Sequence, residues 1–297
     1  MAYPTVAAPY GLKPVNLIGG RVFAGSTRMF PITNGYSTSL FNGDVVAIGT
    51  GANIGNLVSS TLAYNASSAV NGTIGVFVGC EYSTTGGPIY GKNRYQFWQA
   101  STTAPDAIGY VVDDPQAVFQ AVCLSNPAGT GGSTTIQYLN PAFVGSNAYY
   151  IGAAAGNTGS TTTGDSSAGI AISAAATSTS AITPLTTSAP FRIVGVVPAS
   201  AVTVTQNATS SSTTITLSAA NTAILPGMVI SGPGITAGSN TYVTTVNGTT
   251  VTINTAVTTD QSTAAQFSFT GYPEALVTWN FGYHSYFNAN GVYLRSI

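Results

Sequence analysis

Short apolar runs recur along the chain, and each is bounded by residues typical of turns. Runs of about four to seven residues that are rich in Val, Ile, Phe and Tyr predict β-strands rather than helices. The run at 74–79 is apolar at successive positions, so it predicts a central strand buried on both faces. Strands are expected at residues 45–48, 75–80, 95–98, 108–112, 118–124 and 191–197, with 275–281 as the partner of 191–197.

Between residues 200 and 271 the pattern changes to Thr alternating with Val, Ile, Leu or Phe. This two-residue period is typical of strands with one buried and one solvated face. The Asn247-Gly248 pair lies between Val and Thr and predicts a tight hairpin turn. Residues 200–271 are therefore expected to form a compact β module of about five or six strands, inserted into the main domain.

Three other stretches lack a clear strand pattern. Residues 1–30 contain Pro and Gly at intervals that exclude a helix, and predict an extended arm lying on the body or on a neighbouring subunit. The stretch 141–151 is compatible with one short helix or with an irregular crossing. Residues 152–189 are mostly Ala, Gly, Ser and Thr, and predict a long surface excursion.

Together these patterns predict an all-β fold class. The main domain, a β-sandwich or a barrel-like structure, is expected to comprise residues 31–199 plus 272–297. The extended N-terminal arm (1–30) precedes it, and the small β module (200–271) is inserted into it.

Charge is scarce: seven basic and eight acidic residues make up 5% of the 297 residues, where about 25% is usual. Binding to nucleic acid needs a field of Lys and Arg against the phosphates, so no nucleic-acid partner is expected. No apolar stretch approaches the ~18 residues of a membrane helix, and the N-terminus lacks the pattern of a secretory signal. We therefore expect no membrane partner, and folding in a reducing cytoplasm.

The residues that commonly carry catalysis are few and scattered. Asp113 and Asp114 are adjacent, so in a strand they would point to opposite faces, and a turn role is expected for them. His284 lies among aromatic residues and lacks a nucleophile–acid pattern, which favours a packed histidine. Cys80 and Cys123 have no zinc-ligand spacing; two buried free thiols are favoured over a disulfide between them. We expect no enzyme activity, no metal and no cofactor.

Two groups of aromatic residues have two interpretations. They could stack against sugars, or they could pack in a core or an interface, and packing is favoured because sugar sites usually add charged or amide partners. The groups are Tyr90, Tyr95, Phe97 and Trp98, and Trp279, Phe281, Tyr283, Tyr286 and Phe287.

The arm is the candidate interface. It cannot form a self-sufficient element, yet it carries aromatic residues and three of the seven basic residues. We expect it to contact a neighbouring subunit or a larger assembly. The candidate interface residues are Tyr3, Tyr10, Lys13, Arg21, Phe23 and Arg28.

Several stretches resemble virion structural proteins of tailed bacteriophages, notably phages of marine bacteria and cyanobacteria. They include Pro-Tyr-Gly-Leu-Lys-Pro-Val-Asn-Leu-Ile-Gly-Gly at 9–20 and Phe-Asn-Gly-Asp-Val-Val at 41–46. They also include Asp-Asp-Pro-Gln-Ala-Val-Phe at 113–119. The remaining similar stretches are 23–28, 75–80, 97–101, 191–195 and 281–286.

The resemblance implies a capsid decoration, or cement, protein that binds outside an icosahedral shell and clamps neighbouring subunits. Its implied partners are the major capsid protein and further copies of itself, and a homotrimer is expected. The implied location is the capsid exterior, after assembly in the host cytoplasm. A tail, fibre or knob component is the alternative within this class. A bacterial surface or polysaccharide-binding β protein is the alternative outside it.

Overall fold

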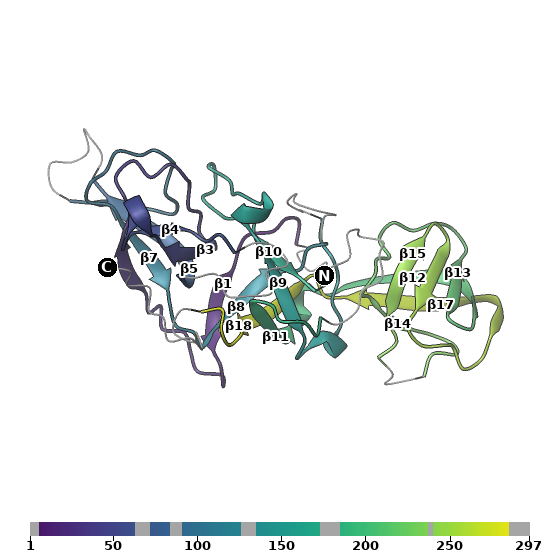
Figure 1. Ribbon diagram of the computed structural model, residues 1–297. Helices are drawn as coiled ribbons and strands as arrows, with labels where there is room; N and C mark the ends of the chain where they lie inside the picture. Colours follow the sequence, from purple (N-terminus) through teal and green to yellow (C-terminus); the bar gives the residue numbers. More distant parts are fainter. Residues whose placement is uncertain are drawn as a thin grey trace.

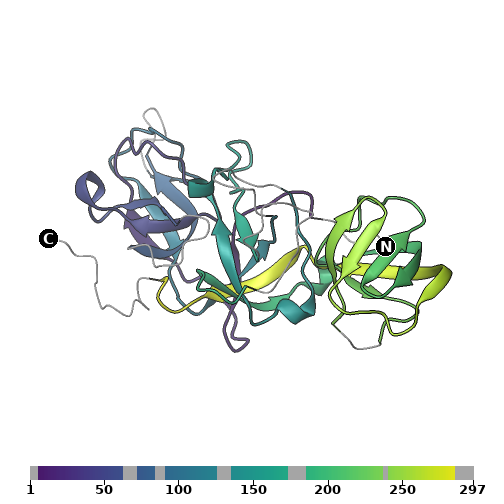
Figure 2. The ribbon, with the colours of Figure 1, turned by 45° about the vertical axis from the view of Figure 1, so that its right-hand side comes forward.

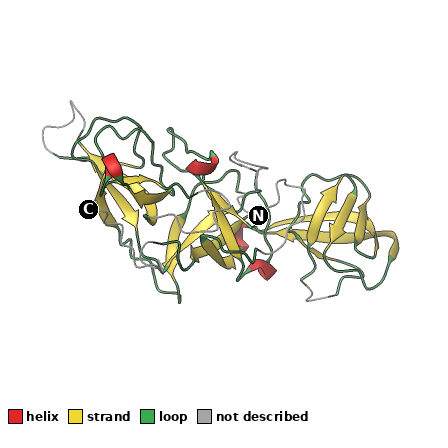
Figure 3. Ribbon diagram, viewed as in Figure 1, coloured by secondary structure: helices red, strands yellow, loops and turns green. Residues whose placement is uncertain are grey.

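The computed structural model describes residues 6–62, 72–83, 91–125, 135–172, 185–236 and 240–284. Within these residues the chain is all-β, as expected, with three six-stranded antiparallel sheets and only short 3-10 helices (Figure 3). The sheets follow one another along an elongated molecule (Figure 1). We call them the N-terminal sheet, the central sheet and the module sheet.

The N-terminal sheet is built around β5, which pairs with β3, β6 and β7. Side chains alternate along these strands, so Val46, Phe77 and Val111 enter one core. Their neighbours Val45 and Val76 enter a second core, which is shared with the central sheet. The expectation of a central strand buried on both faces is confirmed for β5. The strands are β2 (Arg28–Pro31), β7 (Ile108–Val112), β5 (Thr73–Tyr82), β3 (Val45–Ile48), β4 (Leu57–Ser59) and β6 (Asn93–Tyr95).

The central sheet curls toward a barrel. Its order is β1-β8-β18-β11-β9-β10, and β10 returns to the end of β8, where the Leu124 N–H donates to the Ile170 carbonyl at 2.7 Å. The predicted pairing of 191–197 with 275–281 is found in β11 and β18, where Phe191 lies opposite Trp279. The strands are β1 (Lys13–Leu17), β8 (Ala117–Val122), β18 (Glu274–Trp279), β11 (Phe191–Val196), β9 (Asn147–Ile151) and β10 (Gly169–Ala171).

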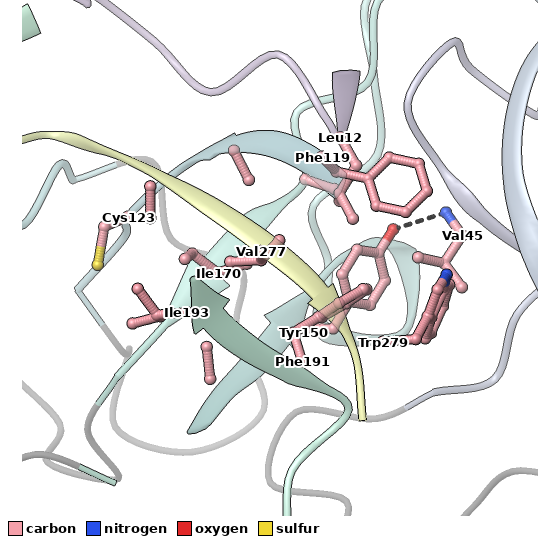
Figure 4. Close-up of a cluster of buried hydrophobic side chains, with 14 of the residues drawn as sticks. Leu12, Val45, Phe119, Cys123, Tyr150, Ile170, Phe191, Ile193, Val277 and Trp279 are labelled. Carbon is pink, nitrogen blue, oxygen red and sulfur yellow. Dashed lines mark hydrogen bonds between the residues drawn. The ribbon is translucent and has the colours of Figure 1, made fainter. Parts of the chain in front are cut away.

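A shared core joins the first two sheets. Phe119, Phe191 and Trp279 of the central sheet are buried in it (Figure 4). The phenol oxygen of Tyr150 accepts a hydrogen bond from the Val45 backbone N–H at 3.1 Å, which ties β9 to β3. This bond satisfies a backbone donor that would otherwise be buried without a partner.

The module sheet also closes on itself. Its order is β14-β17-β12-β13-β16-β15; at the ends, Val243 N–H donates to the Met228 carbonyl (2.8 Å) and Ile230 N–H to the Thr241 carbonyl (3.0 Å). Closure removes the open edges that invite strand addition. The strands are β12 (Val202–Ser211), β13 (Thr214–Leu217), β14 (Val229–Ser231), β15 (Val243–Asn247), β16 (Thr250–Ile253) and β17 (Gln261–Gly271).

The module has its own core, around Phe267 and Phe269, and it joins the central sheet through two adjacent strands. Val202 at the start of β12 lies opposite Gly271 at the end of β17, so both connections leave the central sheet side by side (Figure 2). The rings of Phe143 and Tyr242, 5.3 Å apart, add a contact at this junction. Independent folding of the module stays a prediction.

Several predicted elements differ from those of the structure. β6 ends at Tyr95, and Trp98 instead forms a bridge with Leu40. β8 ends at Val122, although the next two residues are bridged to other segments. The 141–151 stretch contains a short 3-10 helix, η2 (Pro141–Phe143), followed by β9, a strand that the pattern did not predict.

The predicted surface excursion at 152–189 is wrong for its central part. Ala168, Ile170 and Ile172 are fully buried in the shared core. Small residues suit this place because β10 runs close to β8: a Cβ on Gly169 would lie 2.7 Å from the Val122 carbonyl oxygen. Residues 173–184 lie outside the described residues.

The described part of the arm lies on the body of the same chain. β1 is paired with β8, and β2 with β7. Leu12 is fully buried in the shared core. The arm was expected to lie either on the body or on a neighbouring subunit, and its described part lies on the body.

Candidate interaction surface

The predicted interface residues Tyr10 and Lys13 belong to a polar cluster on the central sheet. The Tyr10 phenol donates to the Glu274 carboxylate, and Gln120 Nε2 donates to the same oxygen at 2.9 Å. Burial, with the nearby carboxylate, raises the pKa of Tyr10, so the phenol stays a donor at neutral pH. The Lys13 ammonium lies 4.1 Å from the centre of the Tyr10 ring. This cluster fastens the arm to β8 and β18.

Arg21 and Arg28 both contact the connection between β7 and β8. Arg21 Nη2 donates to Gln116 Oε1 at 2.9 Å, and Arg28 Nε lies 2.9 Å from Asp113 Oδ2. β7 belongs to the N-terminal sheet and β8 to the central sheet. The arm therefore contacts the segment that connects these two sheets. The basic residues of the arm therefore have internal partners.

The aromatic interface residues are not freely displayed either. Phe23 is half-buried and packs against the shared core. Tyr3 lies outside the described residues. The structure thus brings Tyr10 and Lys13 together at one place and Arg21 and Arg28 at another. It gives each of them a contact within the same chain.

Several large apolar side chains of the arm are exposed beside its polar ones, and residue-by-residue reasoning missed them. Of eight large apolar side chains that are exposed among the described residues, four lie between residues 15 and 29. Their exposed fractions are 39% for Val15, 47% for Ile18, 82% for Val22 and 61% for Met29. The sequence shows that these residues are apolar, but their exposure depends on how the arm packs on the two sheets. We call these four residues the arm apolar set.

Asp44 is a buried carboxylate that the sequence did not single out. It accepts hydrogen bonds from the Ser166 hydroxyl (2.5 Å) and the Phe41 backbone N–H (2.8 Å). No basic side chain is paired with it among the described residues. Burial raises its pKa to about 6, although both hydrogen bonds oppose that rise. Its contacts join the turn before β3 to the loop before β10.

His284 is packed, as the sequence predicted. It is fully buried, with its ring 5.4 Å from that of Trp279. Burial lowers its pKa to about 4, so the imidazole is neutral at pH 7. Asp113 and Asp114 lie in the turn after β7, also as expected.

The predicted free thiols are confirmed: Cys80 and Cys123 are buried and unpaired. Burial raises the pKa of each thiol to about 12, which suppresses the reactive thiolate. Within the described residues, no group of three or more His, Cys, Asp and Glu side chains is arranged to hold a metal ion.

Packing accounts for the described members of the two aromatic groups except Phe281, whose side chain is 72% exposed. Tyr95 stacks on Tyr82 at 4.3 Å, and Phe97 on Phe41 at 5.4 Å. Trp98 is fully buried, and Trp279 packs against Phe191 at 4.5 Å. Tyr90, Tyr286 and Phe287 lie outside the described residues.

Comparison of the chain with protein-family models, with curated proteins and with solved structures gives no match. None of the helices in the described ranges has the length and apolar character needed to cross a bilayer.

Proposed function

We propose that this protein is a virion structural protein that decorates an icosahedral phage capsid and stabilises it by bridging neighbouring capsid subunits. The arm apolar set carries the proposal. These side chains lie on a segment that is fastened to two sheets, yet they point to solvent. A contiguous exposed apolar patch is typical of protein–protein contacts, so the proposal requires these four side chains to act as one surface.

The scarcity of charge supports the same function. A contact made by aliphatic side chains and backbone avoids the desolvation cost of buried ion pairs. It also depends little on ionic strength, because salt screens charges and not apolar contacts. Weak contacts repeated over a lattice add up through avidity. The proposed partners are the major capsid protein and further copies of this chain arranged as a symmetric trimer.

The test is binding to purified capsids that lack this protein, measured by co-sedimentation. The variant Val22→Ser/Met29→Ser removes the two most exposed members of the arm apolar set. Ile54→Ser is the matched control, because Ile54 is 57% exposed but lies outside the arm. We expect the double variant to bind at least about tenfold more weakly, and the control to bind normally. Equal binding by all three proteins would contradict the proposed surface.

A second measurement tests the stabilising role. Capsids with and without the protein are heated in low salt and in about 1 M salt, where charge interactions are screened over about 3 Å. We expect decorated capsids to survive to a higher temperature in both. Equal stability of the two kinds of capsid would rule out cementing. Stabilisation that disappears in high salt would assign the contact to the charged residues.

The placement of the module favours one alternative, a tail, fibre or knob component. The module lies at one end of the elongated molecule, beyond a two-stranded connection (Figure 1), as an exposed tip would. Copy number in purified virions, measured by mass spectrometry, separates the two functions. A copy number comparable to that of the capsid subunits supports decoration, and one comparable to that of tail proteins supports the alternative.

A further inference from the structure

A groove of about 590 Å³ opens beside β5, bordered by β6, β7 and the arm. Its floor is formed by β5 at Val78 and Gly79. Polar side chains surround the floor: Asn42, Arg94 and Gln96, with the phenol of Tyr110 and the backbone of Tyr95. A volume between about 300 and 1,000 Å³ is usual for small-molecule sites.

The groove follows from two irregularities of the sheet at the same place. β3 and β6 share one edge of β5: β3 pairs with Thr73–Val76 and β6 with Cys80–Tyr82. The residues between them are left uncovered by either strand. On the other edge, the register with β7 shifts between Phe77 and Gly79. A bulge of this kind bends a strand and often lies beside a binding site.

Gly79 keeps the floor open. Its φ is 138°, and a Cβ there would lie 2.9 Å from the Tyr95 carbonyl oxygen. Any other residue would therefore both strain the backbone and press on β6.

The side chains of the groove are held in place by neighbours. The Arg94 guanidinium lies 4.7 Å from the centre of the Tyr110 ring, which orients its planar group. The hydrogen bond of Tyr110 to Glu81 raises the phenol's pKa. Tyr95 borders the groove with its backbone, because its ring is stacked on Tyr82 in the core. Gln96 donates from Nε2 to Asp165 Oδ1 at 3.0 Å, which leaves its carbonyl oxygen as an acceptor.

The chemistry of these groups selects a class of ligand. Arg94 is the charged residue among the lining side chains that the structure describes, and a guanidinium binds a carboxylate through two parallel hydrogen bonds. Amide and phenol groups, as in Asn42, Gln96 and Tyr110, match the hydroxyls of a sugar. One cation is too few for a nucleic-acid chain. The polar lining also gives an apolar peptide side chain little to bury against.

We propose that this groove binds an acidic carbohydrate, with its carboxylate on Arg94 and its hydroxyls on the amides of Asn42 and Gln96 and on the phenol of Tyr110. The site lies on the N-terminal sheet, outside the arm apolar set. Its binding is a property of the isolated chain and does not depend on the proposed capsid role.

Isothermal titration calorimetry of the full chain tests the site. The probes are tetragalacturonate and a hyaluronan tetrasaccharide as acidic sugars, and maltotetraose as a neutral sugar. Arg94→Ala removes the guanidinium, whereas Arg94→Lys keeps the charge but not the paired donors. Arg192→Ala is the matched control, because Arg192 is an exposed arginine on β11, away from the groove. Thermal unfolding of each variant checks that it is folded.

We expect at least one acidic tetrasaccharide to bind, and maltotetraose to bind more weakly. Arg94→Ala should weaken binding of the acidic sugar at least about tenfold, since hydrogen bonds to charged groups are strong. Arg94→Lys should give an intermediate loss, and Arg192→Ala no loss. The proposal is overturned if neither acidic sugar binds, or if the two alanine variants lose affinity equally. It is also overturned if maltotetraose binds as well as the acidic sugars.

Discussion

Tyr10 donates a hydrogen bond from its phenol to the carboxylate of Glu274, which lies 264 positions further along the chain. The bond joins the segment before β1 to the beginning of β18. The whole inserted module lies between the two residues in sequence, so the central sheet is completed by the two ends of the described chain. Glu274 is buried, and its described donors, Tyr10 and Gln120, are neutral.

Tyr10→Phe should lower the free energy of unfolding by about 1–3 kcal/mol, because it removes a hydrogen bond to a buried carboxylate. Urea denaturation measures the loss. Tyr138→Phe is the control: Tyr138 is a half-buried tyrosine on which burial alone raises the pKa. Its change should stay within about 0.5 kcal/mol. Similar losses in both variants would show that the bond to Glu274 contributes little.

Asp44→Asn should change how stability depends on pH. The pKa of Asp44 is about 6 in the folded protein and 3.8 in the unfolded chain, so the fold favours the neutral carboxyl. Its contribution to stability therefore grows as pH falls from above 6 toward 4, by an amount on the order of 1–3 kcal/mol. The amide imitates the neutral acid and does not titrate, so the variant lacks this gain.

The effect of His284 on stability has the opposite dependence on pH. The wild type and Asp44→Asn both contain His284, so they must be compared with each other at each pH. Its pKa falls from 6.5 to about 4 on folding, so the unfolded chain takes up a proton first and acid destabilises the fold. The free energy of unfolding of Asp44→Asn, measured relative to that of the wild type, should therefore be lower at pH 4.5 than at pH 7. Chemical denaturation at both pH values gives the difference. A constant difference would mean that Asp44 has an ordinary pKa.

Arg28→Ala should have a small effect on stability. The Arg28 side chain is 57% exposed, and exposed ion pairs contribute about 0–1 kcal/mol. The loss should shrink further in about 1 M salt, where the Debye length is about 3 Å. Thermal unfolding at two salt concentrations measures it. A loss above about 2 kcal/mol, unchanged by salt, would show that Arg28 acts through packing instead.

Removing the module should leave a folded protein. Val202 and Gly271 are paired, so a short Gly-Ser bridge in place of residues 202–271 spans the gap without strain. The remainder should stay soluble and rich in β-structure by circular dichroism, with some loss of stability where Phe143 loses Tyr242. The excised module should fold by itself, because its sheet closes around its own core. An unfolded remainder would show that the module is part of the main domain.

Cys80 and Cys123 should resist thiol reagents in the native state. Burial raises both pKa values to about 12, so the thiolate is scarce at pH 8 and the sulfur is covered. Labelling with a colorimetric disulfide reagent should be slow in buffer and complete in denaturant. Rapid labelling of the native protein would show that one of the two cores opens readily.

Local patterns were enough to predict most strands. In the module, Thr alternates with apolar residues and Asn247-Gly248 marks a hairpin, and β15 and β16 meet there. These features depend on neighbours in sequence, because period and turn chemistry are local properties. The pairing of β11 with β18 was also predictable, since both segments are strongly apolar and flank the module.

The sequence by itself thus determined the all-β class, the main strands and the scarcity of charged chemistry. Only the tertiary structure decided which residues of the stretch rich in Ala, Gly, Ser and Thr are buried, such as Ala168 and Ile170, because a partner strand far away in sequence covers them. The tertiary structure also decided the burial of Asp44, which raises the pKa of its carboxyl. It likewise decided the groove beside Arg94, which exists because two strands share one edge of β5. Burial, strand closure and bulges depend on contacts between distant segments, and periodicity along the chain does not encode them.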